Sequence, residues 1–307
     1  MIYFLISLLV FISVLLVCAY YAYRIAFFSP MKGRDELTPV RGSNYDPYRE
    51  EMRRIYRQLK DRPYEEIHIT SHDGLILAGR YYHVKDGAPL AIGFHGYRST
   101  SARDFAGGSE LLLQMEHNLL LVDQRAHGKS SGRTISFGIL ERQDLLKWVD
   151  YALARFGHDV KILLYGISMG GATVLMASEL PRPKTVRGII ADCPYSSPMD
   201  VILYVGRDKP VPTWLIRPFA IWGAKIFGGF DLTEADARSA VAHSRVPILI
   251  LHGENDTFVP AEMSRIEDSN PEMVSRYTFP HADHGISCLV DGPRYRKIVT
   301  DFVSRVL

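Results

Sequence analysis

The sequence predicts an α/β fold in which a mostly parallel sheet of eight strands is covered by helices on both faces and is preceded by a transmembrane helix. Short apolar runs bounded by Gly, Asp and Pro recur from Glu65 onward. Helix-length stretches alternate with these runs after residue 90, which is typical of α/β proteins. Two of the runs, 162–165 and 248–251, are apolar throughout, which suits parallel strands buried on both faces.

The elements follow from these patterns in order. Strands are expected near 65–70, 75–83, 90–94, 118–122, 160–165, 185–191, 246–251 and 273–279. Helices are expected over 48–59 and near 102–116, 141–156, 169–179, 260–269 and 292–305. The first two strands follow each other without room for a helix, so the sheet should begin antiparallel.

The composition is that of a globular protein with a large core. The 307 residues are 47% hydrophobic and carry 36 basic and 34 acidic side chains. This balance excludes a nucleic-acid partner, which requires a concentrated basic surface, and leaves the oligomeric state open. Three widely separated cysteines, Cys18, Cys193 and Cys288, form neither a disulfide framework nor a zinc motif.

The first 23 residues contain no charged side chain. A helix of this length is roughly 35 Å long, enough to cross a hydrocarbon layer of about 30 Å. A cleaved signal peptide is the alternative, but no basic residue precedes the apolar run, as it does in most signal peptides. We therefore expect a membrane anchor over 1–28, a linker and N-terminal helix over 29–64, and one catalytic domain over 65–307.

Basic residues follow the apolar run and none precedes it: Arg24, Lys32, Arg34 and Arg41. By the positive-inside rule this asymmetry favours a single-pass protein of the cell membrane with its domain on the cytoplasmic side.

Residues 195–240 separate two strands by more than one crossover helix needs. The segment is rich in aromatic side chains, and long insertions of this kind are usually functional. We expect a helical lid over the carboxyl edge of the sheet, with a substrate pocket formed by Tyr97, Tyr195, Trp214 and Trp222.

The motif Gly-Ile-Ser-Met-Gly at 166–170 follows an apolar strand and opens a helix-forming run. This strand–turn–helix context is what the Gly-x-Ser-x-Gly nucleophile elbow requires, because the glycines allow a sharp, close-packed turn that exposes the serine. Ser168 is therefore the expected nucleophile.

A serine hydroxyl needs a base and a carboxylate, which in this motif follow the serine in the order acid, histidine. Asp256 lies in the loop after the strand at 246–251, and His284 lies in the loop after the strand at 273–279. Asp256 precedes a helix start and Gly285 lets its loop turn back over the sheet, so we predict Asp256 and His284 as the partners of Ser168. Glu254 and Asp283 are alternative carboxylates, and His281 is the alternative imidazole.

An acyl-transfer site also needs donors for the oxyanion. The loop after the strand at 90–94 opens at the same edge of the sheet, so we expect the backbone N–H groups of Tyr97 and Met169 to serve. His95 is expected to brace this loop. Residues 123–130 end in Gly-Lys-Ser but lack the first glycine of a phosphate-binding loop, so Asp123, Arg125 and His127 are expected to brace structure.

Together these motifs resemble the α/β-hydrolase superfamily over residues 65–307, and are similar to its bacterial, membrane-anchored branch near serine aminopeptidases and monoacylglycerol lipases. The resemblance implies Ser168, Asp256 and His284 as a catalytic triad and Tyr97 and Met169 as the oxyanion hole. No nucleotide-binding glycine motif occurs, and His281 and His284 lack further metal ligands, so neither cofactor nor metal is expected.

The leading functional hypothesis is a lipase-like or esterase-like serine hydrolase that cleaves small-molecule or lipid acyl esters at a membrane. A serine aminopeptidase is the first alternative, and it would need an acidic group for the substrate's amino terminus. Acidic candidates in the lid segment are Asp200, Asp208, Asp231, Glu234 and Asp236, offset by Arg207, Lys209, Arg217 and Lys225. The second alternative is a non-catalytic binding protein with the same fold.

Overall fold

The computed structural model describes residues 1–30, 42–181 and 183–307, so Lys32, Arg34 and Arg41 lie outside the described residues. Its centre is one eight-stranded sheet of order β1-β2-β4-β3-β5-β6-β7-β8, in which the two pairings of β2 are antiparallel and the others parallel. The strands are β1 (Glu65–Thr70), β2 (Ile76–Tyr82), β3 (Leu90–Phe94), β4 (Asn118–Asp123), β5 (Ile162–Ile167), β6 (Val186–Asp192), β7 (Ile248–Gly253) and β8 (Val274–Phe279). All eight predicted strands are therefore present.

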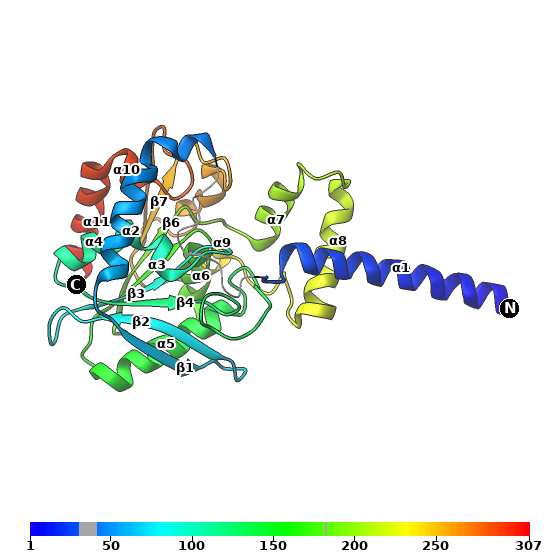
Figure 1. Ribbon diagram of the computed structural model, residues 1–307, viewed down its shortest axis with the longest axis horizontal. Coiled ribbons are helices and arrows are strands. Elements are labelled where there is room, and N and C mark those ends of the chain that lie inside the picture. Colours follow the sequence, from blue (N-terminus) through cyan, green and yellow to red (C-terminus); the bar gives the residue numbers. More distant parts are fainter. Residues whose placement is uncertain (31–41, 182) are drawn as a thin grey trace.

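Helices cover both faces of this sheet (Figure 1). One hydrophobic core is shared by α5 (Glu141–Phe156), α6 (Met169–Met176) and α9 (Ala237–Ala242). The other contains α2 (Arg49–Asp61), α4 (Ala106–Gln114) and α11 (Gly292–Val306). The remaining helical elements are α1 (Ile2–Ala26), η1 (Ser43–Tyr48), α3 (Ser101–Asp104), η2 (Ala177–Glu179), α7 (Pro198–Gly206), α8 (Thr213–Gly223), the π-helical turn η3 (Ala224–Gly228), η4 (Ala261–Ser264), η5 (Glu267–Ser269) and α10 (Ser287–Val290).

The helix expected at 260–269 is wrong, because the chain forms only the short 3₁₀ turns η4 and η5 there. The carbonyl of Ala261 accepts from the Arg276 guanidinium and from the Ser264 hydroxyl instead of a helical N–H. Ile266 is buried in the core, and its φ of −126° and ψ of 4° are not helical. Side-chain hydrogen bonds, one local and one from Arg276, thus replace a helical one.

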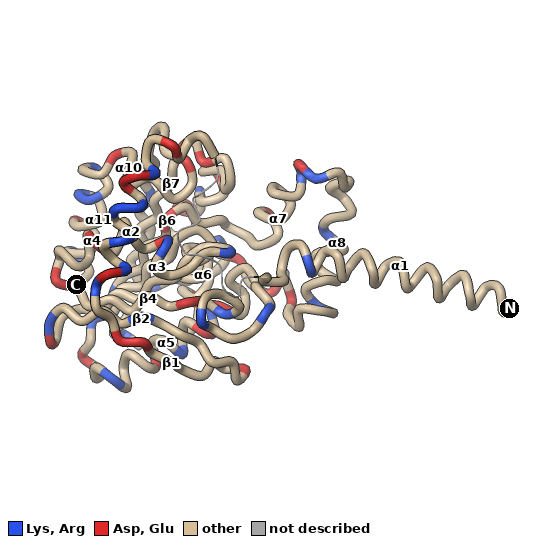
Figure 2. The backbone as a smooth tube through the Cα atoms, in the orientation of Figure 1, with Lys and Arg blue, Asp and Glu red and all other residues tan. Residues whose placement is uncertain are grey.

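The apolar helix α1 projects from the globular body and carries no charged side chain before Arg24 (Figure 2). Its outer part makes few contacts, but its C-terminal end is built into the domain. Phe27 has 0% of its surface exposed and packs edge-to-face on Phe137 and Phe230. Backbone hydrogen bonds join residues 27 and 29 to the 133–135 loop. The C-terminal end of α1 and the residues that follow it are therefore part of the hydrophobic core.

The segment 195–240 is helical, as predicted, and contains α7, α8, η3 and α9. The helix α8 packs on α1, and Figure 1 shows the two helices crossing outside the body of the sheet. At the crossing, a Cβ on Gly223 would lie 2.7 Å from the carbonyl oxygen of Ala19, so only glycine permits this approach.

Candidate active site

Ser168 lies in the sharp turn between β5 and α6. Its φ of 56° and ψ of −115° are strained for a residue with a side chain, and its N–H donates to the Asp192 carbonyl at 2.8 Å. A Cβ on Gly166 would lie 2.1 Å from the Gly170 carbonyl oxygen, and one on Gly170 would lie 1.8 Å from that of Phe94. The two glycines therefore let helix and strand pack close enough to hold this turn. The Ser168 side chain does not cap its helix, so the hydroxyl is free for another partner.

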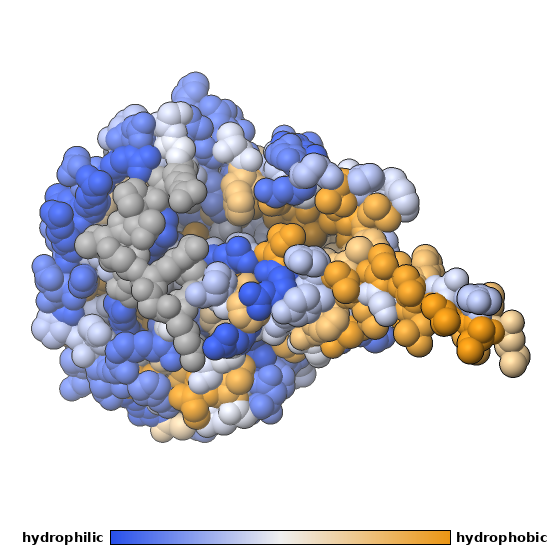
Figure 3. Space-filling view, turned by 45° about the vertical axis from the view of Figure 1, so that its right-hand side comes forward, coloured by the Kyte–Doolittle hydropathy of each residue, from blue (hydrophilic) through white to orange (hydrophobic). Residues whose placement is uncertain are grey.

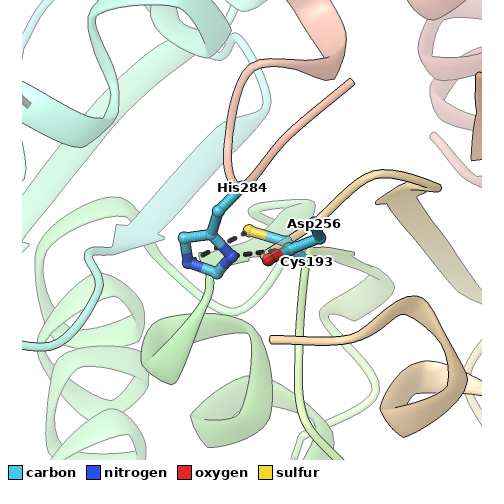
Figure 4. Close-up of side chains that lie close together, drawn as sticks. All are labelled: Cys193, Asp256 and His284. Atoms are coloured by element: carbon cyan, nitrogen blue, oxygen red, sulfur yellow. Dashed lines mark hydrogen bonds and ion pairs between the residues drawn. The ribbon is translucent and has the colours of Figure 1, made fainter. Parts of the chain in front are cut away.

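The structure brings the three predicted side chains into one hydrogen-bonded chain. The Ser168 hydroxyl lies 2.9 Å from Nε2 of His284, and Nδ1 of His284 lies 2.7 Å from Oδ2 of Asp256. Figure 4 shows the His284 ring facing Asp256 and Cys193, which lie next to each other on one side of it. Since a carboxylate can only accept, Nδ1 carries the proton and Nε2 accepts from the serine.

The electrostatics of the pair suit proton transfer. Burial alone would raise the pKa of Asp256, but the His284 and His252 rings hold the pKa of its carboxyl well below the ordinary value. Burial would lower the pKa of His284, and the Asp256 carboxylate outweighs it and raises that pKa. A charged aspartate therefore favours the imidazolium that forms when the histidine takes a proton.

The alternative partners have other roles. Asp283 accepts from the N–H groups of Thr257 and His284 and from the Asn44 side chain, so it ties three loops together. Glu254 accepts from the Thr278 hydroxyl at the surface. Among the described residues, no contact joins these carboxylates, or His281, to Ser168.

His252 is a functional candidate that the sequence reasoning missed. Its Nε2 lies 3.1 Å from Oδ2 of Asp256 and 2.9 Å from the carbonyl oxygen of Val259, and two acceptors require that this nitrogen carry a proton. The side chain is fully buried. Its position four residues before Asp256, at the end of β7, is the only sequence signal for it. His252 therefore holds the carboxylate in place through Oδ2, the same oxygen that faces His284.

Cys193 also lies beside the imidazole. Its Sγ is 3.8 Å from Nε2 of His284, and it occupies a left-handed conformation at the end of β6 (Figure 4). Burial raises the pKa of this thiol well above its ordinary value, so it is a neutral neighbour and no rival nucleophile.

Two backbone N–H groups are free to receive a negative oxygen. The Gly96 N–H donates to Asp104 and the Arg98 N–H donates to His127, but none of the hydrogen bonds of the described residues uses the N–H of Tyr97 or of Met169. The Met169 N–H also starts α6, where a helix favours negative charge. Both N–H groups predicted as oxyanion donors thus lack a hydrogen-bond acceptor among the described residues, which leaves them available to a substrate oxygen.

Histidine and glutamine side chains brace these loops. Nε2 of His95 accepts from the Gln124 N–H, and Nε2 of His127 accepts from that of Arg98. Burial, followed by the neighbouring His95, lowers the pKa of His127 to about 3, so the ring is neutral and able to accept. Asp123 accepts from the Ser101 hydroxyl and braces the start of α3.

A cavity of about 340 Å³ lies beside Ser168 and His284. Tyr97 lines it, as predicted, but Tyr195, Trp214 and Trp222 do not. Tyr195 is buried and donates to the Phe137 carbonyl, and α8, which carries Trp214 and Trp222, packs on α1 instead. The wall comes instead from η1 and α2, whose contributing side chains are Tyr45, Arg49, Met52, Arg53, Ile55 and Tyr56.

Comparison with known proteins agrees with this geometry. A sequence profile described as the alpha/beta hydrolase fold matches residues 93–229. With its elbow, sheet order and loop placement, this chain has the alpha/beta hydrolase fold.

Particular relatives are distant. The uncharacterized protein YqkD of Bacillus subtilis is 28% identical over 198 residues, which are 64% of this chain and 65% of YqkD. Thiohydrolase aneE of Aspergillus aculeatus is 29% identical over 138 residues, 44% of this chain and 43% of aneE. The chain therefore matches less than two thirds of the length of either relative. The solved esterase Pf2001 of Pyrococcus furiosus is 25% identical, with a TM-score of 0.63 over 81% of this chain and 95% of that one.

Proposed function

We propose that this protein is a serine hydrolase that cleaves carboxylic esters through an acyl-enzyme on Ser168. The observation that carries the proposal is the hydrogen-bonded chain in which His284 lies 2.9 Å from the Ser168 hydroxyl and 2.7 Å from Asp256. The distant likeness to an esterase and to a thiohydrolase supports the same class of acyl transfer.

The proposed reaction has two steps. Ser168 attacks the ester carbonyl carbon while His284 takes its proton, and the carbonyl oxygen gains negative charge that the N–H groups of Tyr97 and Met169 stabilise. His284 then returns the proton to the departing alkoxide, which leaves as the alcohol. Water, deprotonated by His284, releases the acyl group as an acid and restores Ser168.

The charge around the cavity argues against an aminopeptidase. The only carboxylate among the described residues that line it is that of Asp104, and its oxygens accept from the Gly96 N–H and the Ser99 hydroxyl. Four arginines also line the cavity: Arg49, Arg53, Arg98 and Arg103. Arg49 and Arg53 are paired with Asp46 and Glu50. Arg98 and Arg103 still outweigh Asp104, so a protonated amino terminus would meet net positive charge there. We therefore favour a neutral or anionic acyl substrate.

We further propose that α1 remains attached as a membrane anchor, with the domain on the cytoplasmic side. Its apolar stretch is long enough to cross a bilayer. The Tyr97 hydroxyl donates to the Ala26 carbonyl at 2.7 Å, and the Arg98 guanidinium donates to the carbonyls of Ile25 and Phe28. Cleavage near residue 27 would remove these partners and the buried Phe27 from the domain.

The test uses the full chain in detergent micelles, because the end of α1 belongs to the core. We expect a fluorophosphonate probe to label Ser168 and p-nitrophenyl esters of short and medium acyl chains to be hydrolysed, with both lost in Ser168→Ala. A matched aminoacyl p-nitroanilide should be a poor substrate. Labelling without turnover of any ester or thioester would overturn the proposal, and preference for the anilide would favour the peptidase.

A further inference from the structure

Helix α8 and the turn η3 present large apolar side chains that the described protein leaves wholly or partly exposed. Trp214 is 75% exposed and Trp222 is 40% exposed. Their neighbours Ile226 and Phe227 are exposed as well. Only small residues of this stretch are buried: Ala220, Gly223 and Ala224. A surface helix normally buries its large apolar residues and exposes its polar ones, so this pattern indicates a partner outside the chain.

The apolar surface is continuous with α1. Tyr20 and Phe227 pack edge-to-face with ring centroids 5.3 Å apart, next to the close approach of Gly223 to Ala19. Figure 3 shows hydrophobic surface that extends from the projecting helix onto the adjoining part of the molecule. Whatever surrounds α1 therefore also meets α8.

The crossing of α1 and α8 lies at a distance from the N-terminal end of α1 that matches the thickness of a bilayer. The part of α1 beyond it, Ile2–Cys18, is roughly 17 residues or about 25 Å long, close to the hydrocarbon thickness of about 30 Å. Tyrosines follow at the crossing, at Tyr20, Tyr21 and Tyr23, as aromatic residues do where membrane meets water. Because α8 runs across α1, it lies along the membrane plane when α1 spans the membrane (Figure 1).

Charge supports a lipid surface as the occupant. The stretch Thr213–Gly228 carries two basic side chains, Arg217 and Lys225, and no acidic one. Both are exposed and can reach phosphate groups while the aromatic rings enter the apolar layer.

We propose that α8 and η3 lie in the headgroup region of an anionic bilayer beside α1, with Trp214 and Trp222 in contact with lipid. This inference rests on the proposed anchor. It turns the 195–240 segment from a lid over the cavity into a second membrane contact. One side of the cavity is then tied to the membrane-spanning helix, because Tyr97 and Arg98 line the cavity and hold the end of α1.

The chain contains three tryptophans, which makes a direct test possible. Trp148 is 1% exposed in the core and serves as an internal control. The full chain is reconstituted into phosphatidylcholine–phosphatidylglycerol vesicles with and without brominated acyl chains, which quench tryptophan only on contact. We expect brominated lipid to quench the emission of the native protein. We expect most of that quenching to be lost in the double variant Trp214→Phe, Trp222→Phe, whose remaining emission comes from Trp148.

Two outcomes separate the proposals. A chain that does not float with the vesicles overturns the anchor. A chain that floats, but whose quenching is the same in native and double-variant protein, overturns the contact of α8 with lipid. Blue-shifted emission from Trp214 and Trp222 without quenching also overturns it, since a second protein chain would then cover them.

Discussion

Replacing Asp256 by asparagine tests the proposed triad most sharply, because the variant keeps the shape of the side chain. Four donors converge on this carboxylate. The N–H groups of Phe258 and Val259 reach Oδ1 at 2.9 and 2.7 Å, while His252 and His284 reach Oδ2 at 3.1 and 2.7 Å. An amide offers one oxygen only, so in either orientation its NH₂ group faces two donors.

The consequence for catalysis follows from the tautomer. If the NH₂ group faces His284, Nδ1 must accept, and the proton moves to Nε2, where it blocks transfer from Ser168. Loss of the correct tautomer in a Ser-His-Asp triad costs about 10⁴-fold in kcat, or about 5.5 kcal/mol. We expect a loss of this size in Asp256→Asn, measured as kcat/KM for p-nitrophenyl butyrate.

Controls come from the alternative carboxylates. Glu254→Gln changes a surface hydrogen bond to Thr278 and should leave kcat/KM within about threefold of the native value, as surface changes usually do. If Asp256→Asn retained activity within tenfold of native protein, or if Asp283→Asn produced the larger loss in kcat, the assignment of Asp256 as the triad carboxylate would be wrong.

The same contacts set the sign of the pH dependence. The reaction needs neutral His284, whose pKa the Asp256 carboxylate raises, so activity should rise with pH through a pKa above that of free imidazole. In Asp256→Asn the residual activity should begin at lower pH, and an unchanged pH profile would contradict the pairing of the two side chains.

The free energy of unfolding depends on pH through the same pair. The depressed pKa of Asp256 stabilises the fold at pH values above the pKa of this carboxyl in the unfolded chain, and this stabilisation is lost as pH falls through its pKa in the folded protein. The raised pKa of His284 stabilises the fold at pH values below the pKa of this imidazole in the unfolded chain, and this stabilisation is lost as pH rises through its pKa in the folded protein.

Two further predictions concern the scaffold, with stability measured by urea denaturation in micelles. Gly170→Ala should lose about 3 kcal/mol, since its Cβ would lie 1.8 Å from the Phe94 oxygen, whereas Gly292→Ala meets no atom within 4 Å and should be nearly neutral; equal losses would refute the close-packing argument. Arg125→Leu should lose about 3–5 kcal/mol, because its guanidinium pairs at 2.6 Å with the buried carboxylate of Asp144. Adding Asp144→Asn should restore part of that loss, and no recovery would mean that the stranded charge is not the cause.

The sheet was predictable because each central strand is a short apolar run that can be recognised in the sequence. In the central strands β3 to β7 the side chains are buried on both faces, so nearly every residue is apolar and the run shows in the sequence. The elbow glycines and the loops that follow β7 and β8 likewise lie within short stretches of chain. Local patterns therefore placed Ser168, Asp256 and His284 at one edge of the sheet.

The cavity was not predictable, because its walls depend on packing between distant segments. The Tyr45 hydroxyl donates to the His284 carbonyl, and Asn44 donates to Asp283, so η1 folds over the site across most of the chain's length. Nothing near these residues in the sequence indicates that contact. The prediction that Trp214 lines the pocket was wrong for the same reason. An aromatic-rich helix suggests a lid, but α8 packs on α1 and leaves Trp214 exposed.

Tyr97 shows why α1 and the candidate site cannot be treated as separate parts. Its backbone N–H is free to face the substrate oxygen, its ring stacks on Phe137 with centroids 5.0 Å apart, and its hydroxyl holds the Ala26 carbonyl. Phe137 in turn packs on Phe27, the first residue after α1. A displacement of the end of α1 would therefore be passed directly to the loop that we assign to the oxyanion, and a misplacement of about 1 Å at such a site can cost about 100-fold in rate. The geometry of the site thus depends on the end of the same helix that we propose to hold the protein at the membrane.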